Sequence, residues 1–247
     1  YIGALTAIVI IVVVVCALLL KKAVENTSKH NCMVYPTILV LILGAVSVYA
    51  IVIVKQYYTV HFNIETADKL SRDGNPYTHH IDNGLIENGS YVFSYVCKQE
   101  LVSAWEKRSN LAFDGCDMYG QHKIENTLIR YLNSKGLRKD RIGLESLEDE
   151  DIANIEQGIA NVVYTNRMGL KSRIYSLFWE LSDYRAYGTV SGYTLPRRFE
   201  LWKNALHLIE KHPVLGVGTG DVKEAFAVQL RVSDSPLKDS NKLSHNQ

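Results

Sequence analysis

Two residues near the end of the sequence have side chains suited to moving a group away from a diphosphate. Arg198 lies in the segment 196–202 (PRRFELW), and a guanidinium donates bidentately to phosphate and stays charged. His245 lies in the segment 244–246 (SHN), and histidine titrates near neutral pH, where a general base works best. Taken alone, each would be an ordinary polar surface residue, so their interpretation depends on the sequence around them.

Between these two residues lies a glycine-rich segment, 212–221 (HPVLGVGTGD). Successive backbone amides around Gly216, Gly218 and Gly220 could form an anion-binding nest. The segment is not a dinucleotide-binding fingerprint, because a helical pattern rather than a strand precedes it. The simpler interpretation, which we favour, is a tight structural turn between two helices that glycine permits.

The order and spacing of these pieces resemble the periplasmic loop of the O-antigen ligase and O-antigen polymerase superfamily of bacterial inner-membrane glycosyltransferases. In that family an arginine is followed four residues later by tryptophan, as Arg198 is by Trp202. A helix ending in Pro-x-x-Gly-x-Gly and a His-Asn pair come next, as Pro213 to Gly218 and His245-Asn246 do. The resemblance covers residues 196–246 only.

The resemblance implies a C-type membrane glycosyltransferase fold and transfer of an oligosaccharide from undecaprenyl diphosphate. The acceptor would be a hydroxyl on lipid A–core or on a growing glycan, as in lipopolysaccharide biosynthesis. Arg198 would bind the diphosphate and His245 would be the catalytic base, with no metal or cofactor. Arg173 is a second, weaker candidate for the diphosphate, because the family uses more than one periplasmic arginine. Ligase and polymerase share the motif, so both remain open.

Other clusters of reactive residue types have simpler explanations. His79, His80 and Asp82 could look like metal ligands, but a polar loop is favoured because no second cluster completes a site. Cys97 and Cys116 could form a disulfide in an oxidising compartment or remain two free thiols. Sequence gives no distance between them, so both possibilities stay open.

The first part of the chain predicts two transmembrane helices. Residues 2–20 and 37–54 carry no charged side chain, and each run is about as long as a helix needs to cross a bilayer. The loop between them, residues 21–36, contains three lysines and one glutamate. Short loops rich in lysine stay in the cytoplasm, so we expect residues from about 55 to 247 to be periplasmic, in a multi-pass inner-membrane protein.

The remaining chain, residues 56–247, predicts a large helical domain, so the expected fold class is all-α. Apolar residues recur at helical spacing, and the expected helices are 91–108, 121–135, 148–164, 170–185, 196–211 and 222–232. Residues 63–88, rich in Asn, Asp, Gly and His, predict an irregular connection. We expect the apolar stripes to bury Trp105, Ile155, Leu177, Trp202 and Leu206.

Composition excludes one class of partner and leaves one rival function. Basic and acidic residues nearly balance, 27 against 26, so the chain has no basic surplus for nucleic acid. The sequence starts at Tyr1 within an apolar run and ends at Gln247 just after the motif, so we expect a fragment of a longer protein, inactive by itself. The rival is a two-span sensor whose helical periplasmic domain binds a ligand.

Overall fold

The computed structural model describes residues 41–42, 44–45, 48–49, 51–60, 62–166, 169–213, 216–218 and 220–238. The chain divides into two units, residues 1–56 and 57–247. In the first unit, every described residue is helical. The predicted span at 2–20 and the lysine-rich loop lie outside the described residues, and the span at 37–54 is described only in part. Within the described ranges, no helix combines the length and apolar character needed to cross a membrane.

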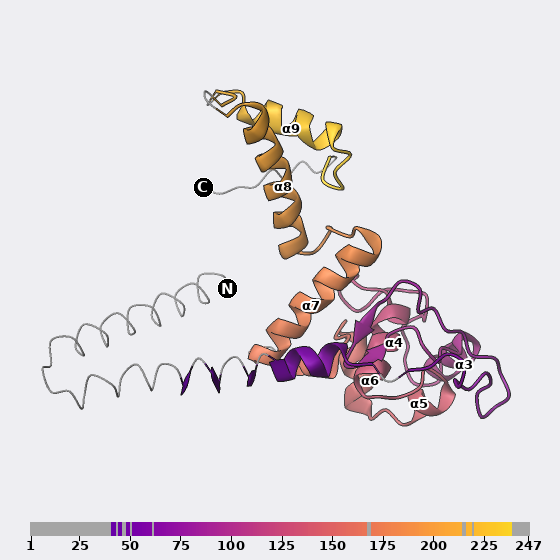
Figure 1. The fold of residues 1–247 in the computed structure, drawn as a ribbon. Helices are drawn as coiled ribbons and strands as arrows, with labels where there is room; N and C mark the ends of the chain where they lie inside the picture. The colour runs from indigo at the N-terminus through magenta and orange to yellow at the C-terminus, as the bar shows by residue number, and fades with distance from the viewer. Residues whose placement is uncertain are drawn as a thin grey trace, which may run out of the picture. The chain divides into compact units, whose positions relative to one another are not determined.

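The second unit is mostly helical, which confirms the all-α class (Figure 1). One short hairpin, β1 (Ile86–Glu87) and β2 (Ser90–Tyr91), pairs in antiparallel fashion. The helices are α3 (Lys98–Trp105), α4 (Ile124–Ser134), α5 (Arg141–Glu145), α6 (Asp149–Glu156), η1 (Val162–Thr165, a 3-10 turn), α7 (Leu170–Tyr187), α8 (Leu195–Lys211) and α9 (Val222–Val232).

The apolar core lies among α3 to α6, with α4 contributing the most buried face. Trp105 and Ile155 are fully buried there, as the sequence predicts. The Trp105 indole donates to the carbonyl of Leu111 at 2.8 Å, so its one polar atom is satisfied. Burying an aliphatic or aromatic side chain stabilises the fold by about 1.5–3 kcal/mol. The residues around α4 form the largest cluster of buried apolar side chains among the described residues.

Two helices in the structure are shorter than the sequence predicts. The predicted helix 91–108 begins only at Lys98, because Val96 forms bridges with Thr78 and Lys139 and Tyr95 has a left-handed φ of 52°. The predicted helix 148–164 ends at Glu156, and Gly158 follows it with a φ of 79° that ends the helical path. In both places tertiary hydrogen bonds replace the helical ladder.

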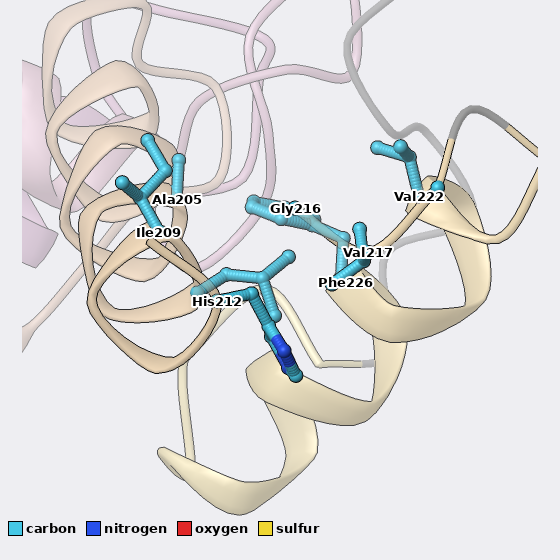
Figure 2. Close-up of a pocket in the computed structure, with 9 residues that line it drawn as sticks. Ala205, Ile209, His212, Gly216, Val217, Val222 and Phe226 are labelled. Atoms are coloured by element: carbon cyan, nitrogen blue, oxygen red, sulfur yellow. The ribbon is translucent and has the colours of Figure 1, made fainter. Parts of the chain in front are cut away.

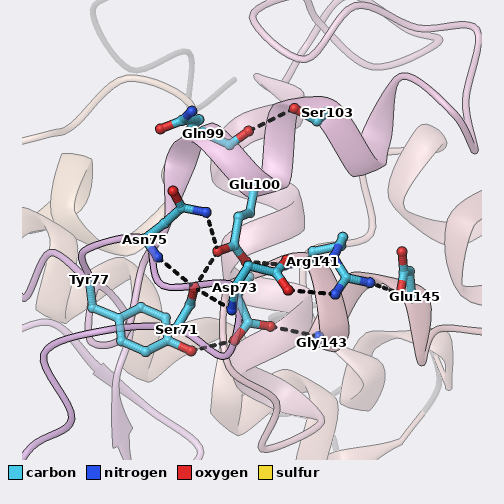
Figure 3. Close-up of polar contacts among 11 residues, drawn as sticks. Ser71, Asp73, Asn75, Tyr77, Gln99, Glu100, Ser103, Arg141, Gly143 and Glu145 are labelled. Carbon is cyan, nitrogen blue, oxygen red and sulfur yellow. Dashed lines mark hydrogen bonds and ion pairs between the residues drawn. The ribbon is translucent and has the colours of Figure 1, made fainter.

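A buried polar cluster holds the irregular segment 63–88 against the helices (Figure 3). Glu100 of α3 accepts hydrogen bonds from the Ser71 hydroxyl, the Asn75 amide at 2.8 Å and the Arg141 backbone N–H at 3.1 Å. Burial opposes ionisation of Glu100, but these donors outweigh it and lower the pKa of the carboxyl. The Arg141 guanidinium also donates to Asp73 at 2.6 and 2.7 Å. This cluster therefore has a structural role.

Helices α7, α8 and α9 have nearly the predicted bounds. In α8, however, the apolar side that was predicted to be buried is exposed. Its buried side is polar: Glu200 is 5% exposed and Asn204 1%. Leu177, Trp202 and Leu206 are instead 39%, 57% and 59% exposed, so their predicted burial is wrong. A helical period identifies an apolar stripe without saying what covers it, and polar partners hold the other side of α8.

Candidate functional site

Arg198 lies in the first turn of α8, which begins after Thr194 with Pro196 in its opening turn. Proline suits this position because its missing N–H has no helical acceptor. Arg198 is half-buried. Among the described residues, none makes an ion pair or side-chain hydrogen bond with its guanidinium. Its charge is therefore not neutralised within the described part of the chain.

The inner side of α8 is held by hydrogen bonds to α7 and to the segment that follows α9. Glu200 accepts from the Tyr184 hydroxyl of α7 and from the Ser235 hydroxyl at 3.0 Å. The bond to Glu200, with burial, raises the pKa of Tyr184 to about 12. Asn204 accepts from the Ser233 hydroxyl at 2.5 Å. These contacts join α8 to α7 and to the end of α9, so the rotation of α8 about its axis is determined.

The described glycines of the segment after α8 adopt turn-like backbone conformations. Gly216 and Gly218 have φ values of 65° and 81°, a region that a side chain with a Cβ rarely enters. Gly220 is exposed, with open space around a Cβ. Asp221 precedes α9 and makes no side-chain cap bond.

Arg198 and the glycine turn lie at opposite ends of α8. Arg198 opens α8 and Gly216 follows its last turn, so a rise of about 1.5 Å per residue separates them by roughly 20–25 Å along the helix axis. The length of α8 therefore separates Arg198 from the glycine turn. His245 lies outside the described residues.

An apolar hollow lies where the end of α8, the glycine turn and the start of α9 meet (Figure 2). Its volume is about 440 Å³. Ala205 and Ile209 line it from α8, Val217 from the turn, and Val222 and Phe226 from α9. Its lining suits a hydrocarbon group better than a phosphate.

Arg173, the second candidate for the diphosphate, lies on α7 beside an open polar groove. Two hollows of about 660 and 460 Å³ share Gln121, His122, Gly158, Tyr164 and Ser176, and so form one continuous groove between α4 and α7. Arg173 lines the smaller hollow and Trp179 the larger. The structure therefore separates Arg173 from Arg198, which lines neither hollow.

A buried ion pair supports one wall of this groove, and no sequence motif pointed to it. Glu87 is fully buried and accepts from Arg130 Nε at 2.9 Å and Nη2 at 2.8 Å. Asn161 donates to the same carboxylate at 2.8 Å and Tyr164 at 3.2 Å. The Arg130 guanidinium stacks on Trp179, 3.5 Å from the ring centroid. Every oxygen of Glu87 is thus hydrogen-bonded, which is how a buried charge is tolerated.

A second group that the sequence did not single out is Lys139. It is 3% exposed, and its ammonium donates to Asn133 Oδ1 at 2.8 Å. Within the described ranges no carboxylate pairs with it, and burial lowers its pKa to about 7. Its surroundings therefore favour the neutral amine.

The remaining candidates carry no site. Cys97 is buried and Cys116 exposed, and both are free thiols. His79 accepts from the Tyr95 backbone N–H at 3.1 Å through Nδ1. Among the residues that the structure describes, no group of histidine, cysteine and carboxylate side chains could hold a metal ion. The segment at 79–82 is an irregular loop in the structure.

Comparison with known proteins yields no relative: no family model, no curated protein and no solved structure matches the chain. Any assignment of activity therefore rests on the residues and their surroundings.

Proposed function

We propose that this chain belongs to a glycosyltransferase that moves an oligosaccharide from undecaprenyl diphosphate to a hydroxyl acceptor, as in O-antigen ligation. The acceptor would be lipid A–core or a growing glycan, at the periplasmic face of the bacterial inner membrane. The arrangement of Arg198, Trp202 and the glycine turn in α8 and its following loop supports this proposal, because it keeps the order found in the O-antigen ligase and polymerase superfamily.

In the proposed reaction, the acceptor oxygen attacks the anomeric carbon of the first sugar. The bond between that carbon and the diphosphate oxygen breaks, and undecaprenyl diphosphate leaves with the bonding electrons. His245 takes the acceptor proton, and Arg198 stabilises the charge that develops on the diphosphate. An arginine side chain can supply positive charge and donate to two phosphate oxygens at once.

The observation that carries the proposal is the state of Arg198. Most arginines described in this chain are already engaged: Arg130 with Glu87, Arg138 with Asp68, and Arg141 with Asp73. Arg198 has no such partner among the described residues, yet it is half-buried on a helix held by several hydrogen bonds. An uncompensated guanidinium on a helix held in this way is suited to bind an anion.

Complementation in cells tests this proposal. The full gene product with Arg198→Lys keeps the positive charge but loses the bidentate hydrogen bonding of the guanidinium. Glycan transfer in a strain lacking the native enzyme should therefore fall steeply. Arg231→Lys is the matched control, because Arg231 is exposed in the last turn of α9. Normal transfer by Arg198→Lys, at equal protein levels, would contradict the diphosphate-binding role.

A further inference from the structure

The outer face of α8 is an apolar stripe that the described residues leave largely exposed, although Ile209 at its end also lines the hollow beside α9. Phe199, Trp202, Leu206 and Ile209 are 39%, 57%, 59% and 61% exposed. They follow one another at intervals of three and four residues, so they lie along one side of the helix. Phe199 and Trp202 also contact each other edge to face, with ring centroids 6.1 Å apart.

This arrangement reverses the usual pattern of a surface helix. In a water-exposed domain the apolar stripe faces the core and the polar side faces solvent. Here the polar side is occupied, because Glu200 and Asn204 are buried and hydrogen-bonded to neighbouring elements. The helix cannot turn its apolar stripe inward without breaking these bonds, so the stripe stays on the outside of the described part of the chain.

The charged residues beside the apolar stripe indicate what kind of surface could contact it. At about 100° per residue, Arg198 borders one edge of the stripe. Lys203 and Glu210 both lie at the other edge, with Glu210 between Phe199 and Lys203, and both are exposed. Lys211 closes the helix with a bond from its ammonium to Gln229 Oε1 at 2.8 Å. Aromatic and aliphatic side chains flanked by basic ones are typical of helices that lie in a membrane interface.

We infer that the outer face of α8 lies on the surface of a lipid bilayer containing anionic lipids. Phe199, Trp202, Leu206 and Ile209 would enter the boundary between head groups and acyl chains, where tryptophan is favoured. Arg198 and Lys203 would then lie at the depth of the phosphates. If the proposed function also holds, this places Arg198 at the level of a lipid-linked diphosphate, but the inference about the bilayer rests on the stripe itself.

Tryptophan fluorescence in proteoliposomes tests the inference. The full chain is reconstituted in phosphatidylethanolamine and phosphatidylglycerol vesicles, with lipids brominated near or far from the head groups. Trp105 is fully buried, and the Trp202→Phe variant measures the quenching due to the other tryptophans. We expect shallow-brominated lipids to quench the wild type strongly and Trp202→Phe only weakly, and iodide in solution to quench Trp202 little.

Two further variants separate docking from folding. Leu206→Glu with Ile209→Glu changes two side chains that are about 60% exposed, so the domain should fold while Trp202 loses its lipid quenching. Leu70→Glu is the matched control, since Leu70 is 56% exposed in a different segment and should leave the quenching unchanged. Full access of iodide to Trp202 in the vesicles would overturn the inference. Shielding of Trp202 from both quenchers, with a dimer by mass, would assign the face to a second copy instead.

Discussion

Removing Arg130 should destabilise the second unit strongly, because Glu87 would remain as a buried charge. Arg130→Met removes two hydrogen bonds to a carboxylate that is 0% exposed. Asn161 and Tyr164 would still donate to it, but neither carries a compensating charge. Breaking one partner of a buried ion pair costs about 3–5 kcal/mol. Loss of the stacking on Trp179 would add to this, by about 1 kcal/mol.

This magnitude corresponds to a large change in thermal unfolding. For a domain of this size, about 1 kcal/mol shifts the midpoint by roughly 2–4 °C, so the broken ion pair alone should lower it by roughly 6–20 °C. Intrinsic fluorescence of the purified chain in detergent measures the midpoint, because Trp105 is in the core. The double variant Glu87→Gln with Arg130→Met removes the charge as well and should recover much of the loss. An unchanged midpoint in Arg130→Met, or a double variant no better than the single, would refute the reasoning.

Three other predictions concern separate parts of the chain. Lys139 has a pKa lowered to about 7 by burial, against about 10.4 when unfolded, so the unfolded chain binds more protons between these values. The free energy of unfolding of the wild type, relative to that of Lys139→Met, should therefore rise with pH across that window by up to about 1.4 kcal/mol per pH unit. Denaturant titrations at pH 7 and pH 9.5 measure this difference, and no relative change between them would contradict the prediction. A thiol reagent should label exposed Cys116 quickly and buried Cys97 only after unfolding, and mass spectrometry that finds the two joined would disprove the free-thiol assignment. Reporter fusions should show a cytoplasmic location at residue 28 and a periplasmic one at residue 150, and the reverse result would contradict both the topology and the proposed function.

Helix positions were predictable where local signals are strong. The pattern in α4 repeats Ile124, Leu128 and Leu132 and ends before Gly136, which has a left-handed φ of 69°. Pro196 and Pro213 bracket α8 in the same way. These glycine and proline residues start or end the helix in which they lie through their local backbone conformation, so the sequence alone is enough to place the helix ends.

The parts that could not be predicted depend on contacts between distant residues. Glu87 and Arg130 are 43 residues apart, and no motif links them. The start of α3 at Lys98 depends on bridges from Val96 to two other segments. The apolar stripe of α8 was visible as a pattern, but its outward direction follows from polar partners of Glu200 elsewhere in the chain. Sequence periodicity contains no information about such partners.

The candidate site was predictable only as a set of residue types. Arg198 was singled out by its spacing to Trp202, and the structure adds that its guanidinium has no partner within the described ranges. Arg173 was a weaker choice and lines a separate groove. The role of His245 remains a prediction, because that residue lies outside the described part of the chain.

Transfer by the purified full gene product tests the central claim most directly. Purified lipid-linked oligosaccharide and lipid A–core are supplied in vesicles, and the formation of glycosylated lipid A–core is followed over time for the wild type and for His245→Ala. Loss of a general base typically lowers the rate by about 10²–10⁴, so we expect product with the wild type and almost none with His245→Ala at equal donor binding. In parallel, the growth of the donor glycan itself would identify a polymerase. Absence of both products with the wild type, or equal product with His245→Ala, would contradict the account.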